Sequence, residues 1–306
     1  MNKILVIKHG SLGDIIFALP AMNSIRKKFP KTSIELLTEE KYFSFFTKSK
    51  LFDNIIIDNR NNFFLRSFFI IFKLLKINYD LIIDLQNSQR TSFYNLFFRL
   101  FHSAKISSSR PFAHYRYYIP SQGSETVIEG LFNQLSLINI PKIDKQNYHW
   151  LEVNLKEKIS KPLALFVTGV SKKGNHKQWQ PEKFAEIAKY YENLNFTICV
   201  VGTPQDQVSI LPILNSCNNI INKVGQSPPE IIYTLALKSS IILSNDTGPG
   251  HIAALAKKNI ILLANDNKIS KSNLPTGSHV YKILSFSVKD ITTEAVIDYI
   301  KKNNLY

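Results

Sequence analysis

The sequence predicts an α/β protein with two Rossmann-like, doubly wound domains that face a central cleft. Short apolar runs, typical of strands buried on both faces, alternate with segments of helical periodicity. Strands and helices that alternate at this spacing form parallel sheets with right-handed crossovers. The alternation stops near the middle of the 306 residues and then restarts, which indicates two domains of similar size.

The first half begins with the strand-like run at residues 3–8. After a turn at Gly10–Gly13, residues 14–28 have helical periodicity, and Pro20 within them predicts a kink or a late helix start. Further strands are predicted at 33–37, 54–58 and 80–84, and helices at 41–48, 63–76 and 90–102.

The second half follows a polar segment at 141–162, which we interpret as a linker. Ser227 and Pro228 are typical of a helix start. We therefore expect one domain at 1–150 and another at 160–306. The terminal helix is the element that can pack back on the first domain. The predicted strands are 163–168, 196–201, 241–244 and 260–264, and the predicted helices are 181–191, 205–214, 228–237 and 292–302.

The composition indicates a soluble, cytoplasmic protein. Two cysteines and no secretory signal fit a reducing compartment, and the most apolar run, 63–77, is broken by Arg66 and Lys73. The 38 Lys and Arg exceed the 23 Asp and Glu by 15, which favours an anionic partner. No nucleic-acid-binding signature is present. The charge and the aromatic-rich segments 63–76 and 93–102 are compatible with peripheral docking on the inner face of the cytoplasmic membrane.

The first turn, residues 9–14, contains two glycines before a helix, a combination that permits close approach of an anionic ligand. It matches neither the dinucleotide fingerprint nor a Walker motif. Asp14 has two interpretations, a carboxylate that caps the helix or a general base at the mouth of the cleft. Spacing alone favours the cap.

Two motifs in the second half favour phosphate binding. Lys172, Lys173 and Lys177 follow the strand that ends at Thr168, where an ammonium and a hydroxyl can reach a phosphate, and Trp179 fits a packing role. The other motif, residues 244–255, runs from a buried strand through Asp246-Thr247-Gly248 into a helix of small residues. Asp246 is either a ligand contact or an Asx-turn cap, His251 fits a structural role, and no spacing suggests a metal site.

These landmarks, in this order, resemble glycosyltransferase family nine, which includes the lipopolysaccharide core heptosyltransferases. The matching stretches are residues 7–20, 84–91, 177–179, 201–206, 245–255 and 291–296. The resemblance implies a GT-B fold and an inverting transfer that needs neither a metal nor a cofactor. It implies a nucleotide-sugar donor, commonly ADP-heptose, in the second domain and a lipid-linked acidic saccharide acceptor, the lipopolysaccharide inner core, in the first.

The resemblance also assigns roles to residues. Asp14 becomes the catalytic base. The residues that bind the donor diphosphate are Thr168, Lys177, Thr247 and Gly248. Other contacts to the donor come from Asp246 and Gly202, and contacts to the acceptor come from Arg90, Arg110 and Ser11. The chain departs from the family in a longer, more basic loop at 169–177, where Lys172 or Lys173 could replace Lys177, and in Thr203–Asp206, where members often carry a glutamate for the ribose.

Other functions stay open at this point. The chain could be a GT-B protein that binds a nucleotide sugar without catalysis, a family member with another donor or acceptor, or an oxidoreductase. The missing dinucleotide fingerprint argues against the last.

Overall fold

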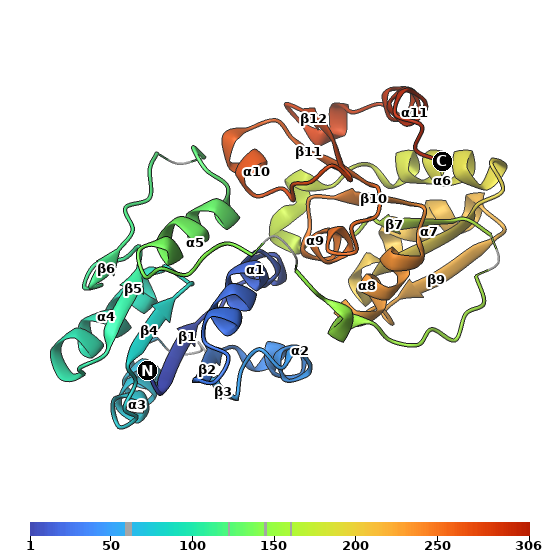
Figure 1. Ribbon diagram of the computed structural model, residues 1–306. Coiled ribbons are helices and arrows are strands. Elements are labelled where there is room, and N and C mark those ends of the chain that lie inside the picture. Colours follow the sequence, from blue (N-terminus) through green and yellow to red (C-terminus); the bar gives the residue numbers. More distant parts are fainter. Residues whose placement is uncertain (59–62, 122, 144–145, 160) are drawn as a thin grey trace. The chain divides into compact units, whose positions relative to one another are not determined.

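The computed structural model describes residues 1–58, 63–121, 123–143, 146–159 and 161–306, and only the backbone of residues 63–66, 172 and 173. The chain divides into two compact units, Met1–Trp150 and Leu151–Tyr306. Each unit contains a parallel sheet whose strands are connected largely through helices (Figure 1). The predicted α/β class with two doubly wound sheets is therefore confirmed.

In the described part of the first unit, six strands pair in the order β3-β2-β1-β4-β5-β6, all parallel. The central strand β1 is buried on both faces, and its Val6 lies opposite Leu36 of β2 and Ile83 of β4. The strands are β1 (Lys3–Ile7), β2 (Ser33–Thr38), β3 (Asn54–Ile57), β4 (Leu81–Asp84), β5 (Lys105–Ser108) and β6 (Tyr115–Arg116).

The helices of the first unit include the long helix α1, which begins at Leu12. Pro20 lies inside α1, so the late start that Pro20 allowed does not occur. The capping box formed by Ser11 and Asp14 provides the start signal instead. The helices are α1 (Leu12–Lys28), α2 (Phe43–Ser49), α3 (Phe63–Leu75), α4 (Gln89–Phe101) and α5 (Val127–Ser136), with 3₁₀ turns at Glu40–Tyr42 and His149–Leu151.

The second sheet, within the described residues of its unit, has the order β12-β11-β10-β7-β8-β9, again all parallel. Relative to its own first strand this order repeats that of the first sheet. The strands are β7 (Leu163–Val167), β8 (Thr197–Gly202), β9 (Ile220–Val224), β10 (Ile241–Asn245), β11 (Ile260–Asn265) and β12 (Val280–Ser285).

Helix α8 of the second unit starts one residue later than predicted. Pro228 is the N-cap of α8, and the Ser227 hydroxyl instead exchanges hydrogen bonds with the backbone of Gly202. The helices are α6 (Pro181–Asn193), α7 (Gln207–Ser216), α8 (Pro229–Lys238), α9 (Gly248–Ala254), α10 (Lys268–Ser272) and α11 (Thr293–Lys302), with 3₁₀ turns at Lys172–Lys177, Pro204–Asp206 and Val288–Asp290.

The core of the second unit joins the sheet to α6, α7 and α11. The terminal helix α11 packs on α6 of the same unit through buried Val296 and Ile300. The hydroxyl of Tyr191 donates to the carbonyl oxygen of Leu305 at 2.9 Å and fixes the end of the chain.

In each sheet the strand order reverses between two neighbours, β1 and β4 in the first unit and β7 and β10 in the second. Ligands of open α/β sheets bind beyond the carboxyl ends of the strands at such switch points. The residues that follow these four strands are therefore the candidates for a site.

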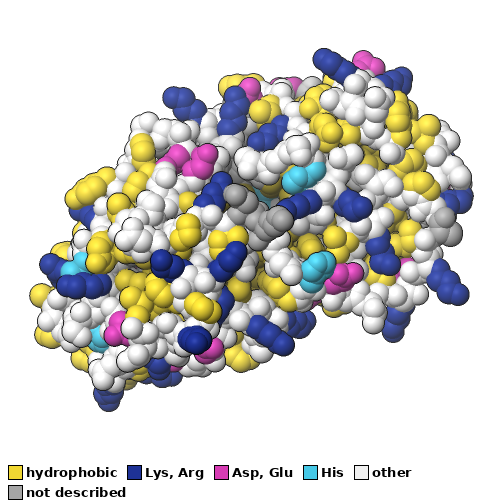
Figure 2. Space-filling view, in the orientation of Figure 1, with side chains coloured by type: hydrophobic (Ala, Val, Ile, Leu, Met, Phe, Trp, Pro, Cys, Tyr) yellow, Lys and Arg dark blue, Asp and Glu magenta, His cyan; other side chains and the backbone are white. Residues whose placement is uncertain are grey.

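Figure 2 shows many Lys and Arg side chains spread over the visible face of both units, with fewer Asp and Glu. Among the described residues, no helix combines the length and the apolar character that crossing a membrane would require.

Candidate active site

In the second unit, Asp246 follows β10 directly and is only 4% exposed. Lys177 Nζ lies 2.6 Å from its Oδ2, and His251 Nε2 lies 3.3 Å from its Oδ1. Burial alone would raise the pKa of Asp246, but the neighbouring His251 and Lys177 outweigh that effect and hold this pKa below its usual range. The carboxylate therefore stays ionised and anchors the Lys177 ammonium at the end of β10.

Thr168, the residue after β7, brings a buried hydroxyl to the same edge. Its Oγ1 has no hydrogen-bond partner within the described ranges. Its carbonyl oxygen accepts hydrogen bonds from Asn245 Nδ2 at 2.7 Å and Gln178 Nε2 at 3.0 Å. A buried hydroxyl without a hydrogen bond lowers the stability of the fold. The Thr168 hydroxyl is therefore available to a ligand, next to the turn that carries Asp246.

The segment that bears Lys177 is held from two strands. Asn245 Oδ1 accepts a hydrogen bond from the backbone N–H of Trp179 at 3.1 Å, and Asn265 Nδ2 donates to the carbonyl oxygen of His176 at 3.1 Å. Trp179 is fully buried and its Nε1 donates to the carbonyl oxygen of Ile291 at 2.8 Å, which confirms its packing role. Lys172 and Lys173, the alternative phosphate contacts, have side chains outside the described part.

Gly169 and Gly202 allow a carboxylate to lie against the ends of β7 and β8. A Cβ on Gly169 would stand 2.3 Å from Asp206 Cγ, and one on Gly202 would stand 3.0 Å from Asp206 Oδ2. Asp206 Oδ2 accepts hydrogen bonds from the Thr203 backbone N–H at 2.7 Å and from the Thr203 hydroxyl at 2.8 Å. The motif at 201–206 thus forms a helix-capping turn packed on two glycines.

Thr247 and Gly248 start helix α9. Thr247 is its N-cap, with Oγ1 accepting from the backbone N–H of Gly250 at 3.3 Å. A Cβ on Gly250 would stand 2.2 Å from Ser244 Oγ, so this glycine lets α9 lie directly on β10. The structure therefore brings Asp246, Lys177, Thr168 and Thr247, four residues that the resemblance assigns to the donor, to one edge of the sheet.

In the first unit, Asp14 occupies the first turn of α1 and is exposed. Its Oδ2 accepts hydrogen bonds from the backbone N–H and the hydroxyl of Ser11, both at 2.7 Å. Gly10 has a φ of +114°, and a Cβ there would stand 2.7 Å from Asp14 Oδ2, so only glycine fits this turn. The capping interpretation of Asp14 is confirmed, and its role as a base stays a prediction.

A buried lysine lies beneath this turn. Lys8 is 5% exposed and its Nζ donates to the carbonyl oxygen of Leu85, at 3.1 Å, which joins the ends of β1 and β4. Burial lowers the pKa of Lys8, and the carboxylates of Asp14 and Asp84 oppose that effect. Lys8 is therefore electrostatically coupled to the predicted base.

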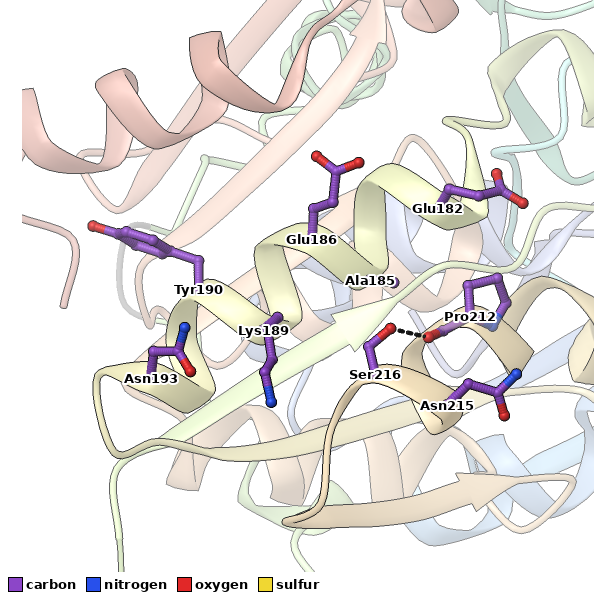
Figure 3. Close-up of a pocket in the computed structure, with 9 residues that line it drawn as sticks. All are labelled: Glu182, Ala185, Glu186, Lys189, Tyr190, Asn193, Pro212, Asn215 and Ser216. Atoms are coloured by element: carbon purple, nitrogen blue, oxygen red, sulfur yellow. Dashed lines mark hydrogen bonds between the residues drawn. The ribbon is translucent and has the colours of Figure 1, made fainter.

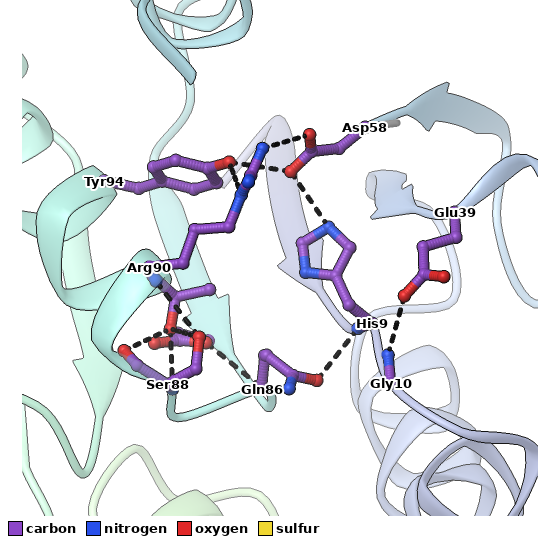
Figure 4. Close-up of polar contacts among 10 residues, drawn as sticks. His9, Gly10, Glu39, Asp58, Gln86, Ser88, Arg90 and Tyr94 are labelled. Atoms are coloured by element: carbon purple, nitrogen blue, oxygen red, sulfur yellow. Dashed lines mark hydrogen bonds and ion pairs between the residues drawn. The ribbon is translucent and has the colours of Figure 1, made fainter. Parts of the chain in front are cut away.

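Arg90 lies in a buried cluster with Asp58, Tyr94 and His9 (Figure 4). Its Nη2 donates to Asp58 Oδ1 at 2.9 Å, the Tyr94 hydroxyl donates to Asp58 Oδ2 at 2.7 Å, and His9 Nε2 lies 3.2 Å from that same oxygen. Burial would raise the pKa of Asp58, but His9, Tyr94 and Arg90 outweigh it and hold this pKa low. Arg90 of α4 thus binds Asp58 at the end of β3, and Asp58 in turn contacts His9. The acceptor role of Arg90 stays a prediction.

Arg110 is the second arginine predicted to contact the acceptor. It is half-buried beyond β5, and its backbone N–H donates to Ser108 Oγ at 3.0 Å. Its Nε has no hydrogen-bond partner among the described residues. The acceptor role predicted for Arg110 stays a prediction.

Sequence reasoning missed Lys8, His9, Asp58 and Tyr94. A signal was present for Lys8 and Asp58, because each is a charged residue that ends an apolar strand-like run. Their burial and pairing could not be read from one sequence.

The structure also contains an open hollow of about 660 Å³ between α6 and α7, shown in Figure 3. Residues such as Glu186, Lys189 and Tyr190 line it. None of the predicted site residues lines this hollow, so it is separate from the candidate site. Within the described ranges, no group of three or more His, Cys, Asp or Glu side chains could hold a metal ion.

The fold places this chain among two-domain α/β proteins of the GT-B type. A glycosyltransferase family 9 structure from Veillonella parvula matches with a TM-score of 0.80 at 19% identity, covering 98% of this chain and 96% of the other. The Escherichia coli heptosyltransferase WaaC with ADP-2-deoxy-2-fluoro heptose matches with a TM-score of 0.78 at 17% identity, covering 98% and 99%.

The sequence identifies the family as well as the fold. The profile of glycosyltransferase family 9 (heptosyltransferase) matches residues 69–272, and the chain therefore belongs to this family. A curated relative, lipooligosaccharide heptosyltransferase 2 of Haemophilus ducreyi, is 24% identical over 298 residues, covering 89% of this chain and 85% of the relative. Family membership confirms the resemblance inferred from the ordered motifs.

Proposed function

We propose that this protein is an inverting, metal-independent transferase that moves heptose from ADP-heptose to the inner core of lipopolysaccharide. Family membership and the names of its relatives support the reaction class, and the Escherichia coli neighbour that holds an ADP-heptose analogue supports the donor. The observation that carries the proposal lies at the switch point of the second sheet, where the buried Asp246 holds Lys177 and the Thr168 hydroxyl has no hydrogen-bond partner among the described residues.

In this proposal the second unit holds the donor diphosphate. Lys177 supplies a cation and Thr168 a hydroxyl, with Thr247 and Gly248 at the start of α9 beside them and Asp246 orienting Lys177. As the bond between the anomeric carbon and the diphosphate breaks, ADP leaves with the electron pair. Groups that are already oriented toward this developing charge stabilise it without further reorganisation.

The first unit then supplies the base. Asp14 takes the proton of the acceptor hydroxyl while the oxygen of that hydroxyl attacks the anomeric carbon from the side opposite the leaving group. The new glycosidic bond has the inverted configuration, and the proton resides on Asp14. The proposal therefore requires the Asp14 carboxylate to reach a donor held by Lys177.

Two measurements test the proposal. Thermal unfolding in the presence of ADP, UDP, GDP or CDP should show the greatest stabilisation with ADP, since a ligand that binds only the folded state raises stability with its saturation. Mass spectrometry of a truncated lipopolysaccharide acceptor incubated with ADP-heptose should show the mass of one added heptose. Stabilisation by another nucleotide alone would refute the donor, and ADP binding without transfer or hydrolysis would indicate a non-catalytic binding protein.

A further inference from the structure

Helix α4 of the first unit is apolar on two sides. Its inner side includes Phe98, which is fully buried in the hydrophobic core of the first unit. Its outer stripe contains Phe93, Phe97 and Phe101, spaced four residues apart, and ends at Leu100 and Phe101, which are 63% and 66% exposed. A surface helix normally presents polar residues on its outer side. Phe93 and Phe97 are half-buried because they pack against Phe68 of α3 and the core, whereas Leu100 and Phe101 remain largely exposed.

Helix α3 extends the same apolar surface. The two helices contact each other and lie side by side in Figure 1. The ring of Phe68 on α3 packs against Phe97, with centroids 5.6 Å apart, and against Phe72 at 6.4 Å, while Phe97 packs against Phe101 at 6.0 Å. We call the exposed apolar side chains of the two helices the apolar ridge, formed by Phe69, Phe72, Leu100 and Phe101.

Positive charge accompanies the apolar ridge. Lys73 of α3 lies four residues after Phe69, on the same side of the helix, and Lys76 follows the end of α3 directly. Arg99 precedes Leu100 on α4, and all three cations are exposed. The sequences of the two helices contain neither Asp nor Glu. The ridge thus combines exposed rings with cations on both helices.

We propose that the apolar ridge docks the first unit on the surface of an anionic phospholipid bilayer. Phenylalanine and leucine side chains insert at the boundary between headgroups and acyl chains, while flanking lysine and arginine side chains bind the headgroup phosphates. A protein partner would have to supply acids around an apolar patch at matching spacing, whereas a bilayer supplies both chemistries without a fixed geometry. The inference depends on these two helices alone and is independent of the proposed reaction.

Vesicle co-sedimentation of the full chain tests the proposal. The protein should bind vesicles with about 30% phosphatidylglycerol and not vesicles of phosphatidylcholine alone, and binding should weaken between about 0.05 and 0.5 M NaCl. The double variant Lys73→Gln/Arg99→Gln should lower the partition coefficient about 25-fold at low salt, since each cation near the surface contributes about fivefold. The matched control Lys301→Gln/Lys302→Gln removes two exposed cations of α11 in the second unit and should have a much smaller effect.

The rings are tested separately. Phe72→Ser/Phe101→Ser should reduce binding about tenfold or more, because two inserted rings are lost. Phe286→Ser, at a side chain that is 93% exposed in the second unit, is the control and should bind like the wild type. In a third variant, Phe101→Trp, the added indole should show a blue-shifted emission on anionic vesicles, whereas Phe286→Trp should not, so the test does not depend on the stability of the serine variants.

Binding to neutral vesicles that equals binding to anionic ones would overturn the proposal, as would ridge and control variants that behave alike. If no vesicle is bound and Phe72→Ser/Phe101→Ser converts a dimer to a monomer, the ridge covers a second copy of this chain and the proposal is wrong.

Discussion

The buried pair of Asp58 and Arg90 allows a direct test of what holds the loop of the predicted base. In the variant Asp58→Asn the side chain keeps its shape but loses its charge, so the buried Arg90 guanidinium loses its ion pair with the Asp58 carboxylate, and the hydroxyl of Tyr94 loses its strong acceptor. Removing one partner of a buried ion pair costs about 3–5 kcal/mol. Asp58 is 2% exposed, so solvent does not replace the lost interactions.

A second aspartate–arginine pair of the same unit is the control. Asp53 lies 2.6 Å from Arg26, closer than the 2.9 Å of Asp58 and Arg90, but its side chain is 53% exposed. Asp53→Asn should therefore lower the free energy of unfolding by only about 1 kcal/mol, since exposed ion pairs contribute little. This loss includes the weakened hydrogen bond that the Ile34 N–H donates to Asp53 Oδ2.

Urea unfolding of the full chain, with hydrogen exchange followed separately in peptides of the two units, measures both variants. The exchange of β1 and β3 should accelerate far more in Asp58→Asn than in Asp53→Asn, and the second unit should be unaffected. Equal destabilisation by the two variants would show that burial does not set the strength of this pair, and would refute the reasoning.

Further predictions concern the pH dependence of stability, a glycine of the second unit and the donor site. The folded-state pKa values of Asp58 and Asp246 lie below their unfolded values, so the stability they contribute is present above about pH 4 and is lost as the pH falls through the folded values. Urea midpoints below pH 4 should therefore drop less steeply in Asp58→Asn than in the wild type, and parallel curves would contradict this. Gly169→Ala places a Cβ 2.3 Å from Asp206 Cγ and should destabilise the second unit by about 1–3 kcal/mol in urea titrations. The nearest atom to a Cβ at Gly174 is the Ser171 hydroxyl oxygen at 3.2 Å, so Gly174→Ala should be tolerated better. The reverse order would show that Asp206 moves freely. Lys177→Met should weaken ADP binding by about 10–100-fold in calorimetric titrations, the loss expected for a hydrogen bond to a charged group. The control Lys189→Met, at a half-buried lysine of α6, should leave the affinity unchanged. Unchanged affinity in Lys177→Met would remove Lys177 from the diphosphate site.

The sequence predicts the central strands because they are continuous apolar runs. β1, β7, β10 and β11 are buried along nearly their whole length, and each was expected within a residue or two. The strands β5, β6, β9 and β12 were not predicted. β9 and β12 lie at the edges of the second sheet and are mostly half-buried, so they mix polar and apolar residues and lack the continuous signal.

The site was predictable to the extent that it follows strand ends. The carboxyl ends of parallel strands meet at one edge, so Thr168 and Asp246 were expected together once their strands were recognised. The pair of Lys177 and Asp246 spans 69 residues, and it depends on how Asn245 and Asn265 hold the loop that carries Lys177. Similarly, Arg90 meets Asp58 across 32 residues, a tertiary contact that no local pattern contains.

The two interpretations of Asp14 are compatible, because a carboxylate has two oxygens. Oδ2 is occupied by the backbone and hydroxyl of Ser11, whereas Oδ1 accepts no hydrogen bond from the described residues. Capping then orients the base, since it fixes the carboxylate at the start of α1. Asp14→Asn retains a carbonyl oxygen for the cap but cannot take a proton, so it should abolish transfer while melting temperature and ADP affinity remain unchanged. Ser11→Ala removes one capping hydrogen bond but leaves the carboxylate, and should reduce kcat only partly. If Asp14→Asn kept its activity, or lost activity only together with stability, Asp14 would be a cap and the base would lie elsewhere.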